Sequence, residues 1–437
     1  MSSVVSGSVA APWLSDARLS RADGHLRRGE VLQAELLFRA TLNDHKDCAP
    51  AARALAAMAG NRGDFAAANH YLALVEALIP DDAGVMIDRA HVQIATGMLE
   101  PARATLERVV ALHPQQHVAW LMLADTRDAC GDGLGALKAR YQGITRAQES
   151  GRWLDERTTD PEVLQAVLRN MQSLQKGQYT LLMQTLDGLT QELGRQDLSR
   201  VARAVSGYLG EWDATPPDPR QRPKFFYFPD LSPGPYHDPM LHPWAATWRD
   251  SWQDVRDEAA SLLAEDKDFE SFLGLRPGQS APEYVGGTNP NASWDAYFFY
   301  RRGERFDDHH ARCPKTSAAL DAIDLCRVAH QAPEVCFSVI RPQSTIMPHH
   351  GVTNTRLVMH LPLIIPGDCA LNIVDGEPHH WREGELMMFD DTYQHGAWNH
   401  TDQARLIVLM DCWNPHLTPA ERVAVTRIVE LIDTIQR

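Results

Sequence analysis

The stretch TRLVMHLPLII, residues 355–365, decides the fold of the second half of this 437-residue chain. Its side chains point alternately to two sides with a period of two, which is the pattern of a β-strand. One face carries the apolar residues Leu357, Met359, Leu361 and Leu363. The other face carries Arg356, Val358 and His360. Because burying an arginine and a histidine is unfavourable without an anionic partner, we expect this second face to line a binding cavity.

Further runs of strand type surround this stretch: DAYFFYRR (295–302), EVCFSVIRP (334–342), ALNIVDG (370–376), ELMMFDD (385–391) and ARLIVLMDCW (404–413). Gly, Pro, Asn and Asp separate them at intervals of about 10–15 residues, as in an antiparallel sandwich or barrel. In the last run Arg405 and Asp411 fall on the same face. The second half is therefore expected to be a β-barrel, preceded by one helical segment at 248–265.

The first half carries an internal repeat. Glycine recurs every 34 residues and is followed five residues later by alanine, in the pairs Gly29/Ala34, Gly63/Ala68, Gly97/Ala102 and Gly131/Ala136. Such spacing predicts helical hairpins, since glycine permits a tight turn and alanine lets two helices approach closely. Pro80 and Pro114 repeat with the same period and end a helix in each unit. Residues 15–150 therefore resemble the tetratricopeptide repeat, an all-α solenoid.

The array implies a concave groove for a peptide or a partner protein. The alternative is that the repeats only support the second domain or form a dimer contact. Residues 151–215 continue with helical periodicity but without the 34-residue repeat, and are expected to form a helical bridge. Proline-rich sequence at 211–236 then marks a boundary, so that the last domain spans 216–437.

Composition excludes several classes of protein. The length suits two or three domains, and a formal net charge of −15 disfavours binding to nucleic acid. Neither a signal peptide nor a membrane span is expected from the sequence. The seven cysteines are odd in number and include no CxxC pair, which favours reduced thiols. A cytoplasmic location is therefore expected.

Histidines are concentrated in the second half, where eight occur within about 70 residues: His349, His350, His360, His379, His380, His395, His400 and His416. Neutral imidazole is the commonest metal ligand in proteins. Most of these residues lie in polar, turn-like stretches, which are ordinary places for a histidine. His349 and His395 differ because each belongs to a longer motif.

Those motifs lie between residues 347 and 415: HxG at His349, TNxRLxxHL at 353–361, WxxGE at 381–385, FDDxxxH at 389–395 and DxWxP at 411–415. Together they resemble the aspartyl/asparaginyl β-hydroxylase family of iron(II)- and 2-oxoglutarate-dependent oxygenases. The resemblance covers about residues 220–425. It implies a double-stranded β-helix of jelly-roll or cupin type with flanking helices, giving a multidomain chain of repeats and oxygenase.

The resemblance implies that His349 and His395 bind the iron and act in catalysis. Where most such oxygenases have a metal-binding carboxylate, this chain has Gly351, which cannot be a ligand. The family shares this departure, in which two histidines suffice. An alternative is that Asp390 or Asp391 serves as a ligand, although carboxylates beside a metal also act as outer partners of its ligands.

Four residues match co-substrate positions of the family: Arg405, His360, Ser338 and Trp294. Arg405 would hold the distal carboxylate of 2-oxoglutarate, and His360 the carboxylate beside the iron. Two alternatives remain. Arg405 could form a structural ion pair with Asp411, and Ser338 and Trp294 could serve only for packing.

The animal protein-hydroxylating members have an arginine where this chain has Val358, so an aspartyl substrate is in doubt. Arg356 could bind the substrate instead, or be purely structural.

The resemblance thus implies a dioxygenase that uses iron(II), 2-oxoglutarate and O2 to hydroxylate an unactivated carbon, with release of succinate and CO2. The first candidate is the β-carbon of an aspartyl- or asparaginyl-like residue in a protein or peptide recruited by the repeats. The alternatives are a free small molecule, such as an amino acid or a lipid precursor, and a non-catalytic repeat scaffold.

Overall fold

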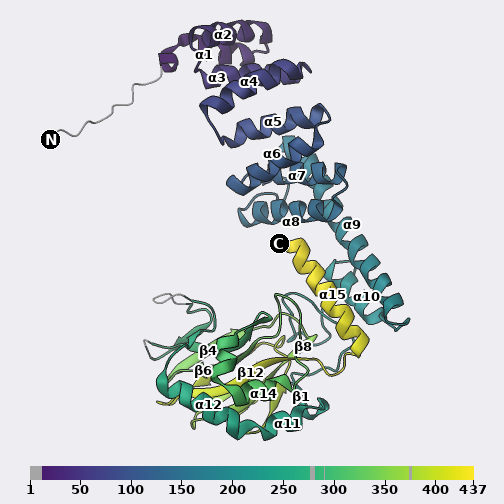
Figure 1. Cartoon of the computed structure of the whole chain (residues 1–437), viewed down its shortest axis with the longest axis vertical. Coiled ribbons are helices and arrows are strands. Elements are labelled where there is room, and N and C mark those ends of the chain that lie inside the picture. The colour runs from purple at the N-terminus through teal and green to yellow at the C-terminus, as the bar shows by residue number, and fades with distance from the viewer. Residues whose placement is uncertain (1–11, 276–280, 290, 374–375) are drawn as a thin grey trace, which may run out of the picture. The chain divides into compact units, whose positions relative to one another are not determined.

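A computed structural model describes residues 12–275, 281–289, 291–373 and 376–437. The chain divides into two compact units (Figure 1). The first holds the residues up to Gly177 together with Ile435–Arg437, and the second holds Gln178–Thr434. The dividing point falls within a long helix, α9 (Pro161–Glu192). The domain limits 15–150, 151–215 and 216–437 remain predictions.

The first unit is a series of helical hairpins that follows a short 3-10 turn at Pro12–Ser15. Its helices are α1 (Ala17–Arg27), α2 (Val31–Asp44), α3 (Ala49–Asn61), α4 (Phe65–Leu78), α5 (Ala83–Ala95), α6 (Leu99–Leu112), α7 (His117–Ala129) and α8 (Gly133–Glu149). The repeating glycines occupy the left-handed region between paired helices, with φ of +77° at Gly63 and +82° at Gly131. The repeating alanines are completely buried. The predicted all-α repeat is therefore confirmed.

The second unit contains two antiparallel sheets. In its described part, one has eight strands in the order β1-β10-β8-β12-β6-β4-β2, with β5 paired to β4, and the other has four in the order β3-β7-β11-β9. The larger sheet comprises β1 (Tyr236–His237), β2 (Glu270–Ser271), β4 (Trp294–Arg301), β5 (Glu304–Arg305), β6 (Val335–Ile340), β8 (Arg356–Ile364), β10 (Met387–Phe389) and β12 (Arg405–Trp413). The smaller comprises β3 (Val285–Gly287), β7 (Ser344–His349), β9 (Cys369–Ile373) and β11 (His395–Asn399).

Helices flank these sheets: α10 (Ser199–Tyr208), α11 (Ala245–Asp250), α12 (Trp252–Glu265), α13 (Asp307–Arg312), α14 (Pro314–Asp321) and α15 (Pro419–Gln436), with a 3-10 turn at Pro239–Leu241. Helices α11, α12 and α14 cover the outer face of the larger sheet (Figure 1), where Trp248, Ala259 and Leu320 pack in one core with Leu357 and Met359 of β8. The antiparallel β-domain with flanking helices is thus confirmed. The other face of β8 is left for the space between the two sheets.

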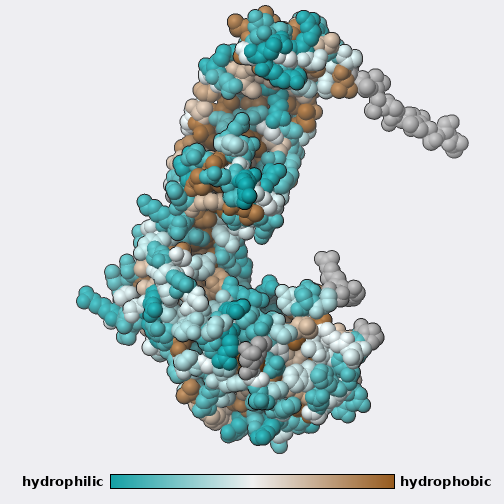
Figure 2. Space-filling view, turned by 180° about the vertical axis from the view of Figure 1, so that it is seen from behind, coloured by the Kyte–Doolittle hydropathy of each residue, from teal (hydrophilic) through white to brown (hydrophobic). Residues whose placement is uncertain are grey.

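The units differ in their surfaces. Figure 2 shows hydrophobic residues gathered along the repeat helices, whereas the surface of the second unit is mostly hydrophilic on the face seen. Exposed large apolar residues of the first unit include Val31, Leu32, Leu36, Met98, Leu112 and Leu134. The seven cysteines are all free thiols. Among the helices that the structure describes, none combines the length and apolar character needed to cross a membrane.

Candidate active site

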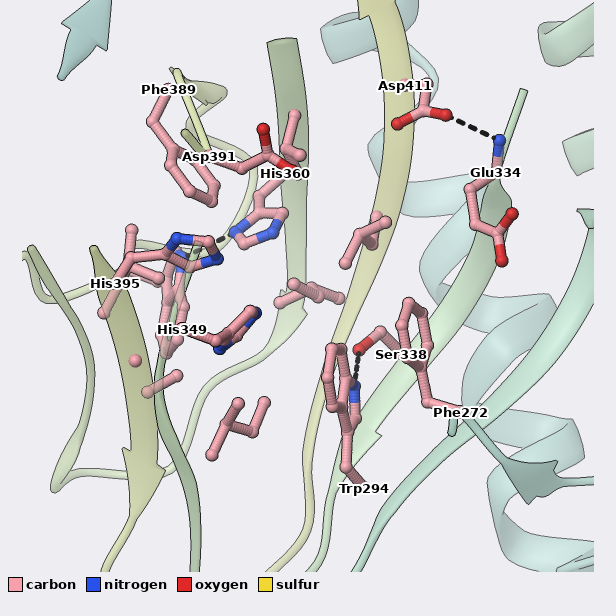
Figure 3. A pocket seen from close by; sticks show the side chains of 18 of the residues that line it. Phe272, Trp294, Glu334, Ser338, His349, His360, Phe389, Asp391, His395 and Asp411 are labelled. Carbon is pink, nitrogen blue, oxygen red and sulfur yellow. Dashed lines mark hydrogen bonds between the residues drawn. The ribbon is translucent and has the colours of Figure 1, made fainter. Parts of the chain in front are cut away.

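A cavity of about 230 Å³ lies between the two sheets of the second unit. Residues of β4, β6, β8, β10 and β12 in the larger sheet and of β7, β9 and β11 in the smaller sheet line it. Figure 3 shows His349 and His395 on one side of it and Ser338 and Trp294 on the other. The structure places in its lining every site residue singled out from the sequence: Trp294, Ser338, His349, Arg356, His360, His395 and Arg405. The expected face of β8 lines the cavity, since Arg356, Val358 and His360 all reach it. The role of each residue remains a prediction.

His349 and His395 form a pair across two neighbouring strands. They are register partners of β7 and β11, and their ring centroids lie 4.2 Å apart. Each ring has its Nδ1 2.9 Å from the main-chain oxygen two residues earlier, Met347 O for His349 and Tyr393 O for His395. A carbonyl only accepts hydrogen bonds, so each Nδ1 carries the proton and each Nε2 keeps a lone pair.

Burial also keeps these two rings neutral. It lowers the pKa of His349, and burial together with the neighbouring His349 lowers the pKa of His395 to about 3. A neutral imidazole with a free Nε2 is the form that binds a divalent metal. The pair therefore has the chemistry of two metal ligands, one from each of two strands.

The carboxyl of Asp391 lies against Gly351, two residues after His349. A Cβ atom added to Gly351 would overlap the Asp391 carboxyl, so that carboxyl lies where a side chain at residue 351 would project. Burial, followed by the neighbouring Asp390, raises the pKa of Asp391 to about 8. Asp390 itself accepts hydrogen bonds from Thr392 and Gln221 and holds the turn before β11. Of the two aspartates, only Asp391 lines the cavity.

In the part of the chain that the structure describes, no group of three or more His, Cys, Asp or Glu residues is arranged to hold a metal ion. Other histidines of the second half have ordinary environments. His380 contacts the carbonyl of Cys369, and His400 lies near the carboxylate of Asp368.

Arg405 lies deep in the cavity, with 2% of its surface exposed. Its Nη1 donates to the carbonyl of Ser338 at 3.3 Å, and its guanidinium lies 4.7 Å from the ring centroid of Trp381. Its Nε has no hydrogen-bond partner among the described residues. Burial lowers the pKa of Arg405 to about 9, which leaves the side chain charged at neutral pH. A buried, incompletely bonded guanidinium is a strong site for a carboxylate.

Asp411 does not pair with Arg405. Its carboxylate lies 3.4 Å from Nη1 of Arg356 and accepts a hydrogen bond from the main-chain N–H of Glu334. Arg356 also donates to the carbonyl of Gln331 at 2.9 Å. These contacts agree with a structural role for Arg356, although its side chain reaches the cavity as well.

His360, Ser338 and Trp294 complete the polar lining at the Arg405 end. The indole N–H of Trp294 donates to Ser338 Oγ at 2.9 Å, and its ring stacks on Phe272 at a centroid distance of 3.8 Å. His360 is 4% exposed, and burial lowers its pKa well below the usual range. Nδ1 of His360 accepts from the indole N–H of Trp381 at 3.2 Å, while its Nε2 has no partner among the described residues.

Sequence reasoning assigned no role to Trp381 or Phe272, and both line this cavity. Trp381 lies inside the WxxGE motif, and a tryptophan in this otherwise polar stretch is the sequence feature that could indicate a place in the site. Phe272 follows β2 in a segment without periodicity, and only the tertiary fold brings it beside Trp294.

Two segments of the chain match models of known protein families. Residues 249–415 match the family described as Aspartyl/Asparaginyl beta-hydroxylase, and residues 62–126 match the Tetratricopeptide repeat. The second half of the chain is therefore similar to this family, and part of the first half is similar to the tetratricopeptide repeat, as the sequence motifs indicate.

Three relatives illustrate the similarity. Aspartate beta-hydroxylase domain-containing protein 2 of Xenopus tropicalis is 31% identical over 214 residues, which cover 48% of this chain and 55% of that protein. Ornithine lipid ester-linked acyl 2-hydroxylase of Rhizobium tropici is 30% identical over 191 residues, 43% of this chain and 64% of that protein. Human Aspartyl/asparaginyl beta-hydroxylase is 28% identical, with coverages of 41% and 22%. The match thus spans less than two thirds of each relative.

Among solved structures, TTC0263, a thermophilic tetratricopeptide protein of Thermus thermophilus, superposes with a TM-score of 0.30 at 18% identity. The match covers 43% of this chain and 94% of that one.

Proposed function

We propose that the second unit is an iron(II)- and 2-oxoglutarate-dependent dioxygenase that hydroxylates an unactivated carbon. The observation that carries the proposal is the pair of neutral histidines, His349 and His395, in the same cavity as the buried guanidinium of Arg405. The match to a hydroxylase family supports it.

The residues present fit both groups. Two imidazoles with free Nε2 atoms suit iron(II), for which imidazole is a favoured ligand. Arg405 and the Nε2 of His360 are buried polar groups with unused hydrogen-bonding capacity. Leaving such groups unsatisfied is costly, and an anionic co-substrate would satisfy them.

When bound, iron(II) and 2-oxoglutarate would supply oxygen activation, with one oxygen atom of O2 entering succinate and the other entering the substrate. The contribution of the chain is to bind, orient and exclude water. Arg405 would hold the distal carboxylate of the co-substrate, with Ser338 and Trp294 beside it. Apolar side chains of Ile346, Leu371 and Phe389 keep the surroundings of the histidines dry.

For the substrate, we propose first an aspartyl- or asparaginyl-like residue of a protein or peptide, hydroxylated at its β-carbon. Two of the relatives are named for aspartate and for aspartyl/asparaginyl residues. The exposed apolar residues of the repeat unit support recruitment of a protein, because such surfaces mark interaction sites.

A free small molecule or lipid precursor is the second candidate. The Rhizobium tropici relative is named an ornithine lipid acyl hydroxylase. Val358 lines the cavity beside other apolar residues and offers no charge for a substrate carboxylate. A non-catalytic scaffold is the weakest candidate, because it gives no reason for a buried charge at Arg405.

The test is succinate formation from 2-oxoglutarate by the full-length protein with iron(II), ascorbate and O2. The double variant His349→Ala/His395→Ala is compared with His400→Ala, which changes a histidine outside the cavity. We expect succinate from the wild type and from His400→Ala and none from the double variant. If the wild type forms no succinate, and neither iron(II) nor 2-oxoglutarate raises its melting temperature, the oxygenase proposal is wrong.

A further inference from the structure

Hydrogen bonds at Nδ1 orient three histidines of the cavity, and one of the three has a different kind of partner from the other two. His349 and His395 each meet a carbonyl oxygen at Nδ1, which fixes their protons on Nδ1. His360 meets a donor there instead, the indole N–H of Trp381. Indole has a proton and no lone pair to offer in the ring plane, so the Nδ1 of His360 must be the acceptor.

From this contact, and resting on the proposed function, we infer that Trp381 is a positioning residue that fixes the proton of His360 on Nε2. A neutral imidazole carries one proton. With Nδ1 engaged as acceptor, that proton is on Nε2, the atom without a partner among the described residues. His360 thereby becomes a donor into the cavity, suited to a carboxylate of the co-substrate, and has no lone pair to offer a metal.

The hydrogen bond between Trp381 and His360 is shielded from water. Trp381 and His360 are each 4% exposed, so water does not compete for the hydrogen bond between them. Trp381 also faces the guanidinium of Arg405 across 4.7 Å, so one side chain contacts both groups that would bind 2-oxoglutarate. The two functions of Trp381 use different parts of the indole, the N–H for His360 and the ring face for Arg405.

This separation allows a clean substitution. Trp381→Phe removes the N–H and keeps an aromatic ring beside Arg405. Trp248→Phe is the matched control, because Trp248 is also fully buried in the second unit but lies outside the cavity, and its N–H has no partner among the described residues. His360→Gln supplies a donor whose proton cannot move to another atom.

The first measurement is calorimetric titration of the Mn(II)-loaded full-length protein with 2-oxoglutarate. We expect Trp381→Phe to weaken binding about tenfold, the size of one buried hydrogen bond to a charged group, and Trp248→Phe to leave it within about twofold. In a His360→Gln background, Trp381→Phe should have little further effect, because it acts through the tautomer of His360. Equal affinities for wild type and Trp381→Phe, or an undiminished tenfold effect in the His360→Gln background, would overturn the inference.

The second measurement observes the tautomer itself. In ¹⁵N-histidine NMR of the metal-free protein, the His360 signals are those lost in His360→Gln. They should report a proton on Nε2 in the wild type and shift toward the other tautomer in Trp381→Phe. A proton on Nδ1 in the wild type would overturn the inference while leaving the proposed oxygenase intact. A wild type that binds neither Mn(II) nor 2-oxoglutarate would instead overturn the proposed function and this inference with it.

Discussion

The two ends of the cavity use similar side chains but hold them by different means. At the histidine end, the rings of His349 and His395 are oriented by main-chain carbonyls two residues earlier in the sequence. At the other end, His360 is oriented by another side chain, Trp381, whose ring also lies beside the guanidinium of Arg405. Main-chain bonds persist through any substitution of the neighbouring side chains. The orientation of His349 and His395 is therefore robust to changes in nearby side chains, whereas the orientation of His360 depends on Trp381.

The largest effect is expected at the histidine end. His395→Ala removes one of two proposed protein ligands, and we expect Mn(II) affinity to fall more than about a hundredfold, with loss of succinate formation. Calorimetry with Mn(II) measures it, and His400→Ala is the control. Retention of wild-type affinity would mean that the metal does not bind at this pair.

Arg405→Met is expected to have the next largest effect, and on a different quantity. It removes the charge that would hold the distal carboxylate, so the affinity for 2-oxoglutarate should fall about fiftyfold while Mn(II) affinity stays within about twofold. Because burial lowers the pKa of Arg405, the charge is unfavourable in the folded protein, and methionine should leave the melting temperature equal or higher. A lower melting temperature together with unchanged co-substrate affinity would show that Arg405 is structural.

The difference between the two ends also explains what could be predicted from the sequence. Strand periodicity indicates that Arg405 faces inward, whereas His349 and His395 stand in short motifs whose resemblance to a known family implies their role. The helical repeat is equally predictable from the sequence, because each hairpin needs its own glycine and alanine. The contacts of Trp381 with His360 and Arg405 join residues more than twenty positions apart, and only the packing of the sheets creates them.

The pairing of Asp411 with Arg356 is not predictable from the sequence for a related reason. Strand periodicity places both charges on inward faces, but the partner of Asp411 depends on the register of β8 and β12. That register places Asp411 opposite Val358 and near Arg356, at the far end of β12 from Arg405. Strand periodicity predicts on which face of the sheet a residue lies, but it does not predict which residue of the next strand lies beside it.

A smaller effect on Mn(II) affinity is expected for Asp391→Asn. This substitution tests whether the metal has ligands in the protein besides His349 and His395. Asp391 occupies the space beside Gly351, and as an outer partner it should contribute about tenfold to Mn(II) affinity. The titration used for His395→Ala measures this. A loss as large as that of His395→Ala would identify Asp391 as a third ligand, the alternative that the sequence left open.

The smallest effect is expected where two side chains share one bond. Trp294→Phe and Ser338→Ala each remove the 2.9 Å hydrogen bond between the indole and Ser338 Oγ, and each should raise the KM for 2-oxoglutarate about threefold. Because the phenyl ring can keep the stacking on Phe272, the packing at this end should survive. The double variant should resemble either single variant, since both break the same interaction. Multiplied effects, about ninefold in the double variant, would mean that the two residues contact the co-substrate independently, and that this end of the cavity is less interdependent than its hydrogen bonds indicate.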